Sequence, residues 1–238
     1  MSGDSASWFC RFRVVGNQVM FTFKYTLEAL WCRWFRKPRT FVFSGKRYRY
    51  FCHPCNLTFR NERAIEIPIM LEIVREHEGE EILEVGNCLS HYVPVHHEVV
   101  DKYEVYPGVI NRDVVDFTPA KSFDLIISIS TLEHLGFDEE VKDPEKPLRA
   151  IRHLTGLLRL GGLMVVTIPL GFNPSVDEML ERGRFRFTQR YCFKRLFPSH
   201  VWKEVGWEAI RGVGYGYEYK SAMGLVIGVI RKERKKVD

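Results

Sequence analysis

Three acidic side chains and one histidine stand at the ends of short apolar stretches, where side chains could bind a ligand or move a proton. Glu84, Asp101 and Asp113 each end or border such a stretch, and His134 follows the longest one, 123–130. If these stretches are parallel strands, their carboxyl ends meet at the sheet edge where ligands bind in open α/β sheets. Carboxylates there accept hydrogen bonds, and a histidine changes charge near neutral pH, which suits a general base. The sequence therefore predicts a ligand-binding edge.

The elements that must position these side chains follow from the apolar spacing after residue 60. Amphipathic patterns predict helices over 68–78 and 147–160, each closed by glycine. Short apolar runs predict strands over 81–85, 98–100, 109–115, 123–130, 163–168, 207–211 and 224–231. Strands that alternate with helices imply a mainly parallel sheet covered on both faces. Only a loop separates the last two strands, so we expect them to pair antiparallel at the sheet edge.

The order of these features resembles a known family. An acid, a glycine turn, a strand-end acid 17 residues later, and then FDLIISISTLEHLG and LLRLGGLMVVTIP are similar to class I S-adenosylmethionine-dependent methyltransferases. The likeness is greatest to the type 11 group and to uncharacterised relatives found near glycan-biosynthesis enzymes, and it covers residues 61–170. The resemblance implies a Rossmann-like, doubly wound, mainly parallel seven-stranded sheet with an antiparallel edge strand. It also implies S-adenosyl-L-methionine as the cofactor.

The resemblance assigns the turn after the first strand to the methionine end of the cofactor. Glu84 and Gly86 match the family motif in which the backbone approaches the cofactor, and Asn87 lies in the same turn. Cys88 and Ser90 replace the second and third glycines of the usual loop, and a Cβ there narrows the space for close approach. The segment before the second strand is also short, so we expect the usual first helix to be clipped.

The remaining cofactor and catalytic positions are implied in the same way. Asp101 matches the acid that accepts hydrogen bonds from the two ribose hydroxyls, and Asp113 with Val114 matches the pair that reads adenine. Ser128 lies where the fourth strand faces the methyl group, and His134 matches the histidine of the LEH sequence and is the candidate catalytic base. A surface acid, a turn cap, a small strand residue and a loop histidine are the ordinary structural alternatives at these positions.

The first 60 residues differ in charge from the rest of the chain. Residues 11–60 hold eleven Lys or Arg and one acid, whereas 61–238 hold 24 basic and 28 acidic side chains. We therefore divide the chain into an N-terminal basic aromatic cap, 1–60, and a methyltransferase domain, 61–238. A basic aromatic surface is compatible with nucleic acid or another anionic partner, and equally with a solvated face whose aromatic residues pack against the main domain.

The six cysteines are too few and too scattered to indicate a disulfide scaffold, so we expect a reduced, cytoplasmic protein. Cys52 and Cys55 form one C-x-x-C pair with no second pair, so no metal site is predicted. No stretch reaches the ~20 apolar residues of a membrane span. The oligomeric state is left open.

An Asn-Glu-Arg-x-x-Glu sequence precedes the first predicted helix. Asn61, Glu62, Arg63 and Glu66 resemble an element of the uncharacterised relatives, and their place suggests that they line the cofactor cleft. Their physical role does not follow from the sequence.

These observations predict a methyltransferase that acts on a small-molecule or glycan acceptor, with oxygen as the expected acceptor atom. His134 would remove the acceptor's proton, and Tyr103, Asn173 or Glu133 would position the acceptor. Two alternatives stay open: an RNA methyltransferase that uses the basic cap, and a non-catalytic scaffold built on a decayed methyltransferase fold.

Overall fold

The computed structural model describes residues 26–30, 32, 34–35, 40–197, 199–216 and 221–233. Within these residues no helix has the length and apolar character needed to cross a membrane. The division of the chain at residue 60 stays a prediction.

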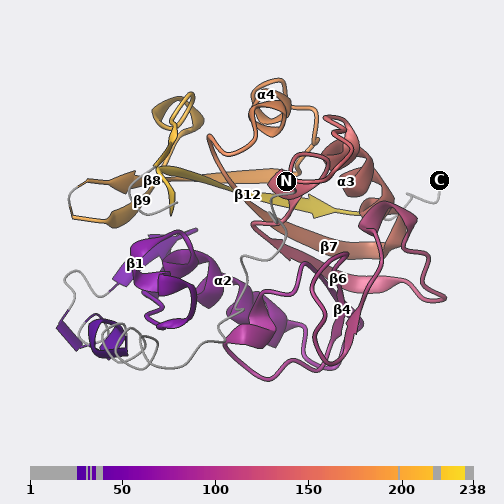
Figure 1. The fold of residues 1–238 in the computed structure, drawn as a ribbon, viewed down its shortest axis with the longest axis horizontal. Helices are drawn as coiled ribbons and strands as arrows, with labels where there is room; N and C mark the ends of the chain where they lie inside the picture. The colour runs from indigo at the N-terminus through magenta and orange to yellow at the C-terminus, as the bar shows by residue number, and fades with distance from the viewer. Residues whose placement is uncertain are drawn as a thin grey trace, which may run out of the picture.

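An eight-stranded mixed sheet organises the described chain (Figure 1). Its strands are β3 (Ile82–Val85), β4 (Glu98–Val100), β5 (Val109–Ile110), β6 (Phe123–Ile129), β7 (Leu158–Pro169), β8 (Gln189–Leu196), β9 (Val201–Val205) and β12 (Gly224–Arg231). The order is β5-β4-β3-β6-β7-β12-β8-β9, with β3 to β7 mutually parallel. The chain winds outward in one direction from β3 and in the other from β6. The strand order therefore reverses between β3 and β6, which is where such sheets bind ligands.

The Rossmann-like, mainly parallel fold with an antiparallel edge strand is confirmed, but the sheet has eight strands instead of seven and the predicted pairing of 207–211 with 224–231 at the edge is wrong. β12 lies inside the sheet, antiparallel to both β7 and β8, and the edge strand is β9. Residues of the predicted strand 207–211 form a short 3-10 helix, Trp207–Ala209, instead. The physical reason is burial: β12 is apolar along both faces and needs neighbours on both sides, whereas the 207–209 segment has no buried residue.

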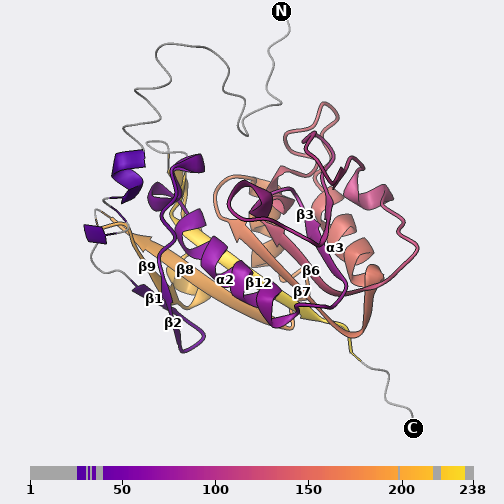
Figure 2. The same cartoon turned by 90° about the horizontal axis from the view of Figure 1, so that it is seen from below.

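Two helical layers cover the sheet (Figures 1 and 2). One face carries α2 (Arg63–Glu76) and the hairpin of β1 (Thr40–Phe43) and β2 (Lys46–Arg49), and the other carries α3 (Lys146–Leu157) and α4 (Pro174–Glu181). Alternate residues of β6 point to opposite layers, as the period of two requires: Ile126 packs with α3, and Ile127 packs with α2. The expected clipping of the first helix is also found, because only the 3-10 turn Leu89–His91 lies between β3 and β4.

The first helix starts earlier than predicted, at Arg63, with Pro68 inside it. A helical proline has no N–H, so the carbonyl four residues before it loses its partner. That carbonyl belongs to Ala64, and it accepts a hydrogen bond from the Phe51 N–H at 2.9 Å instead. A backbone N–H from outside the helix therefore replaces the donor that the proline lacks.

Aromatic side chains of the predicted cap pack onto the sheet where the structure describes them. The rings of Phe41 and Phe43 lie 6.2 and 6.0 Å from the ring of Phe193 in β8, and all three are buried. Trp34 and Phe35 are exposed, and Trp8, Phe9 and Trp31 lie outside the described residues. At β1 the packing interpretation of the aromatic residues holds.

Candidate functional site

The turn after β3 is held from inside by Glu84. This side chain is fully buried, and its Oε1 accepts hydrogen bonds from the N–H groups of Cys88 and Leu89, both at 2.8 Å. Its Oε2 lies 2.8 Å from Nε2 of His97, a partner that no feature of the sequence indicated. Glu84 thus fixes the turn through its backbone, and its carboxylate does not face outward to a ligand.

Gly86 is the position in this turn that only glycine fits. Its φ is +85°, and a Cβ there would lie 2.2 Å from Oγ1 of Thr131. The left-handed conformation and the close approach of the 131 segment both exclude a side chain. The turn therefore lies directly against the loop that follows β6, at the point where the strand order reverses.

Asn87 and Asp101 meet across the ends of β3 and β4. The Asn87 N–H donates to Asp101 Oδ2 at 3.3 Å, and Asp101 Oδ1 accepts from the N–H groups of Tyr103 and Glu104 at 2.8 Å each. Three backbone donors orient this carboxylate: two use both lone pairs of Oδ1, and the third leaves one lone pair on Oδ2. The buried Asn87 Nδ2 has no hydrogen-bond partner among the described residues, so a donor is left without an acceptor at this edge.

Asp113 has a different environment from the one expected of an adenine-reading acid. Its Oδ2 lies 2.5 Å from Nζ of Lys146 and 2.9 Å from Nζ of Lys102, and both lysines also bind Glu139. Burial acts to raise the pKa of Asp113, but the hydrogen bonds from the two lysines hold it below its usual value. Val114 is buried in the α3 core cluster. The Asp113 carboxylate is engaged in a four-residue ion network, which sequence spacing did not indicate.

The two serines at the end of β6 point in different directions. Ser128 is fully buried, and its hydroxyl has no partner among the described residues. Ser130 was inside the predicted strand 123–130, but β6 ends at Ile129 and Ser130 has a φ of +41°. This turn carries the Ser130 hydroxyl to the α2 side, where it donates to Oε1 of Glu66 at 2.6 Å.

The Asn61–Glu66 element forms a buried polar network at the start of α2. Asn61 Oδ1 accepts from the Arg63 N–H at 3.1 Å, Glu62 Oε2 accepts from the Ala222 N–H at 3.0 Å, and Arg63 donates to Glu66 Oε2 at 2.8 Å. All four side chains are at most 9% exposed. Through Ser130, Glu66 reaches the carboxyl end of β6, so the element does lie at the ligand-binding edge.

His134 lies between two carboxyl groups. Its Nδ1 is 2.5 Å from Oδ2 of the exposed Asp138, and its Nε2 is 3.7 Å from Oε1 of Glu133. Burial alone would lower the pKa of His134, but the hydrogen bond with Asp138 and the charge of Glu133 raise it above its usual value. A raised pKa favours the imidazolium at neutral pH, which reduces the fraction able to accept a proton.

Glu133 is the buried member of this pair. It is 1% exposed, and its Oε2 has no hydrogen-bond partner among the described residues. Burial raises its pKa to about 8, although the adjacent His134 acts to lower it. Asn173 Nδ2 donates to the Glu133 carbonyl at 2.8 Å and so joins the segment after β7 to this loop. A carboxyl group that titrates near neutral pH beside a histidine can accept a proton and pass it on.

The cysteines contradict one expectation. Cys32 and Cys52 form a disulfide, whereas we predicted reduced thiols. The C-x-x-C pair is therefore divided, with Cys55 outside the disulfide, and the described residues contain no group of three or more His, Cys, Asp or Glu side chains placed to hold a metal. Sequence spacing could not reveal this pairing because the two cysteines are 20 residues apart and meet only in the folded chain.

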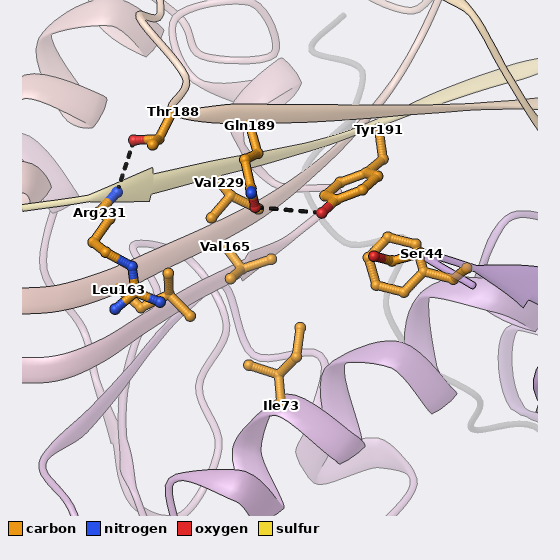
Figure 3. A pocket seen from close by; sticks show the side chains of 10 residues that line it. Ser44, Ile73, Leu163, Val165, Thr188, Gln189, Tyr191, Val229 and Arg231 are labelled. Carbon is orange, nitrogen blue, oxygen red and sulfur yellow. Dashed lines mark hydrogen bonds between the residues drawn. The ribbon is translucent and has the colours of Figure 1, made fainter. Parts of the chain in front are cut away.

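A shallow pocket opens elsewhere, on the α2 face of the sheet (Figure 3). Ile73 of α2, Leu163 of β7 and Tyr191 of β8 line it. Leu163 pairs with Arg231, whereas Pro169, at the carboxyl end of β7, pairs with Leu225. The pocket therefore lies at the sheet edge away from the residues described above.

No protein-family model and no curated protein sequence matches the chain. Among solved structures it is similar to the N-methyltransferase NodS from Bradyrhizobium japonicum WM9 in complex with S-adenosyl-L-homocysteine, at 15% identity and a TM-score of 0.44, over 73% of this chain and 89% of that one. It is also similar to a methyltransferase from Thermotoga maritima described as a possible histamine N-methyltransferase, at 19% identity and a TM-score of 0.40, over 68% and 87%. A further S-adenosylmethionine-dependent methyltransferase, from Clostridium acetobutylicum, has 11% identity and a TM-score of 0.37, over 70% and 89%.

The strand order, its reversal between β3 and β6, and the antiparallel β12 beside β7 identify the chain as a Rossmann-like α/β protein with a doubly wound sheet.

Proposed function

We propose that the protein is a methyltransferase that uses S-adenosyl-L-methionine and acts on a small-molecule or glycan acceptor. The observation that carries the proposal is the junction of Gly86, Asn87 and Asp101 where the strand order reverses. Gly86 allows close approach of the backbone, Asn87 offers an unused donor, and Asp101 is an oriented acceptor. These three groups fit a ligand that carries hydroxyl groups and a polar chain.

The cofactor supplies, when bound, a methyl group attached to a positively charged sulfur. Asp101 would accept hydrogen bonds from the ribose hydroxyls of the cofactor, and the Gly86–Asn87 backbone would lie along its methionine end. Glu84 acts indirectly by fixing this turn through its two backbone hydrogen bonds. Asp113, held by Lys146 and Lys102, would position the segment that begins at Val114 rather than offer a free carboxylate.

Proton removal from the acceptor requires a basic group near the end of β6, on the far side of the Gly86 turn. His134 is the base that we inferred from the sequence, and Asp138 and Glu133 flank its two nitrogens. Alignment of the acceptor with the methyl group would supply most of the rate enhancement, as in other displacement reactions between bound groups.

Calorimetric titration with S-adenosylmethionine and S-adenosylhomocysteine, with NAD as a negative control, tests the proposal. We expect binding of both sulfur ligands, with at least about tenfold weaker binding in Asp101→Ala, because hydrogen bonds to a carboxylate contribute about 1.5–3 kcal/mol. Asp124→Ala is the matched control: this aspartate pairs with Arg159 at the start of β6, at the opposite edge. If neither sulfur ligand binds, the proposal is contradicted and the interpretation as a non-catalytic scaffold replaces it.

A further inference from the structure

The cluster beside the Gly86 turn contains more carboxyl groups than basic ones. Glu62, Glu66 and Glu133 are all buried, and Arg63 is bonded to Glu66 alone among them. Glu62 accepts the Ala222 N–H, and within the described residues neither it nor Glu133 has an Arg or Lys side chain within ion-pair distance. Glu62 therefore has no basic partner within that distance and Glu133 has only His134, at 3.7 Å, and burial of a carboxyl group is unfavourable unless it is protonated or receives a cation.

Aromatic rings stand next to these carboxyl groups. Phe172 lies in the segment that follows β7. Its ring is 4.6 Å from the ring of His134 and 5.3 Å from that of Tyr215. Tyr215 is close enough to Glu62 and Glu133 for both charges to raise the pKa of its phenol, after burial as the main cause. Ring faces attract ammonium groups, and together with a carboxylate they form a common recognition site for amines.

This cluster lies close to the turn that we predict to bind the cofactor. Glu133 is two residues from Thr131, whose side chain fills the space beside Gly86. The Asn173 hydrogen bond to the Glu133 carbonyl holds the Phe172 segment against the same loop. A group bound at Glu133 would therefore lie on the acceptor side of the turn.

We propose that Glu133, with the rings of Phe172 and Tyr215, binds the acceptor through an amino group, so that the acceptor is an amine and the methyl group is transferred to nitrogen. This inference rests on the proposed function and replaces the oxygen atom expected from sequence. The bound ammonium gives one proton to the Glu133 carboxylate, and its nitrogen lone pair forms the new N–C bond. The C–S bond breaks with its electron pair on sulfur.

The geometry also provides a path for that proton. It stays on Glu133 until the product leaves and is then released to solvent beside His134, whose Nε2 lies 3.7 Å from Glu133 Oε1 and whose Nδ1 is bonded to the exposed Asp138. Of the charged and titratable groups near Glu133, His134 and Arg63 favour its ionisation and Glu66 opposes it, while the Glu133 charge also raises the pKa of Tyr215. Arrival of a cation would therefore release the proton that Glu133 holds.

The test uses two probes of the same shape, cyclohexylamine and cyclohexanol, titrated into the complex with S-adenosylhomocysteine. We expect the amine to bind at pH 7 with release of close to one proton, measured by calorimetry in buffers of different ionisation enthalpy, and the alcohol to bind at least about tenfold more weakly. Glu133→Gln should weaken amine binding by at least about tenfold and leave the affinity for S-adenosylhomocysteine unchanged, while Glu140→Gln, an exposed neighbour, should change neither.

The outcomes separate the two proposals. Failure of S-adenosylhomocysteine to bind the wild-type protein contradicts the proposed function. If S-adenosylhomocysteine binds but the two probes have equal affinity, or neither binds, the amine proposal is overturned and the cofactor site stands. Amine binding that is unchanged in Glu133→Gln also overturns it. Retained binding of S-adenosylhomocysteine shows that this variant is folded.

Discussion

Replacement of Glu133 by glutamine should change how the stability of the protein depends on pH. The pKa of this buried carboxyl group is about 8 in the folded protein, against its usual 4.5. An acid whose pKa is raised by folding binds its proton more tightly in the native state. The contribution of Glu133 to the free energy of unfolding is fully present below pH 4.5 and is lost as the pH rises through 8. Linkage between these two values gives a loss of about 3 kcal/mol between pH 4 and pH 7.

Urea unfolding of the wild type and Glu133→Gln at several pH values from 4 to 9 measures this effect directly. The amide cannot ionise, so the variant's free energy of unfolding should gain on the wild type by about 3 kcal/mol between pH 4 and pH 7, whatever the constant cost of the substitution. Glu140→Gln, at an exposed position in the same loop, should follow the wild type. Parallel curves for wild type and Glu133→Gln would refute the reasoning, because they would mean that Glu133 is ionised in the folded protein without cost.

Two further changes test the turn and the disulfide. Gly86→Ala should lose at least about 2 kcal/mol of stability, from a left-handed alanine and its clash with Thr131, and should abolish binding of S-adenosylhomocysteine in calorimetry; near wild-type behaviour would exclude the tight turn. Cys52→Ser should lower the free energy of unfolding by about 3 kcal/mol relative to the oxidised wild type, because the bond to Cys32 closes a loop of 20 residues. The difference should disappear when both proteins are unfolded in a reducing agent, and a difference that persists there would assign the effect to packing.

The sheet was largely predictable because buried parallel strands leave short, uniformly apolar runs in a sequence. The runs at β3, β4 and β6 were predicted to within one residue of their bounds, whereas β7 begins five residues earlier than predicted, where we expected the end of a helix. The place of β12 was not predictable in this way. An apolar strand must be interior, but the sequence does not say which strands flank it, and the loop before it suggested a local partner that the structure does not contain.

In the candidate site, too, local features were predictable and long-range contacts were not. Gly86 and Asp101 lie where the spacing placed them, because a strand end and its turn are local features. The partners of Asp113 and Glu66 could not be foreseen, since Lys146 and Ser130 reach them from distant parts of the chain. The positive φ of Ser130 also carries no sequence signal, because serine has no special preference for that conformation.

Pro68 has a consequence for how the protein unfolds. The Ala64 carbonyl that the proline leaves without a helical partner is buried, so detachment of the Phe51 segment would strand it away from water. The segment that precedes α2 should therefore unfold together with the helix, and we expect amide exchange at Phe51 to be as slow as exchange within the helix. Pro68, which would usually disrupt a helix, here couples the helix to the preceding segment, so that the two form one folding unit.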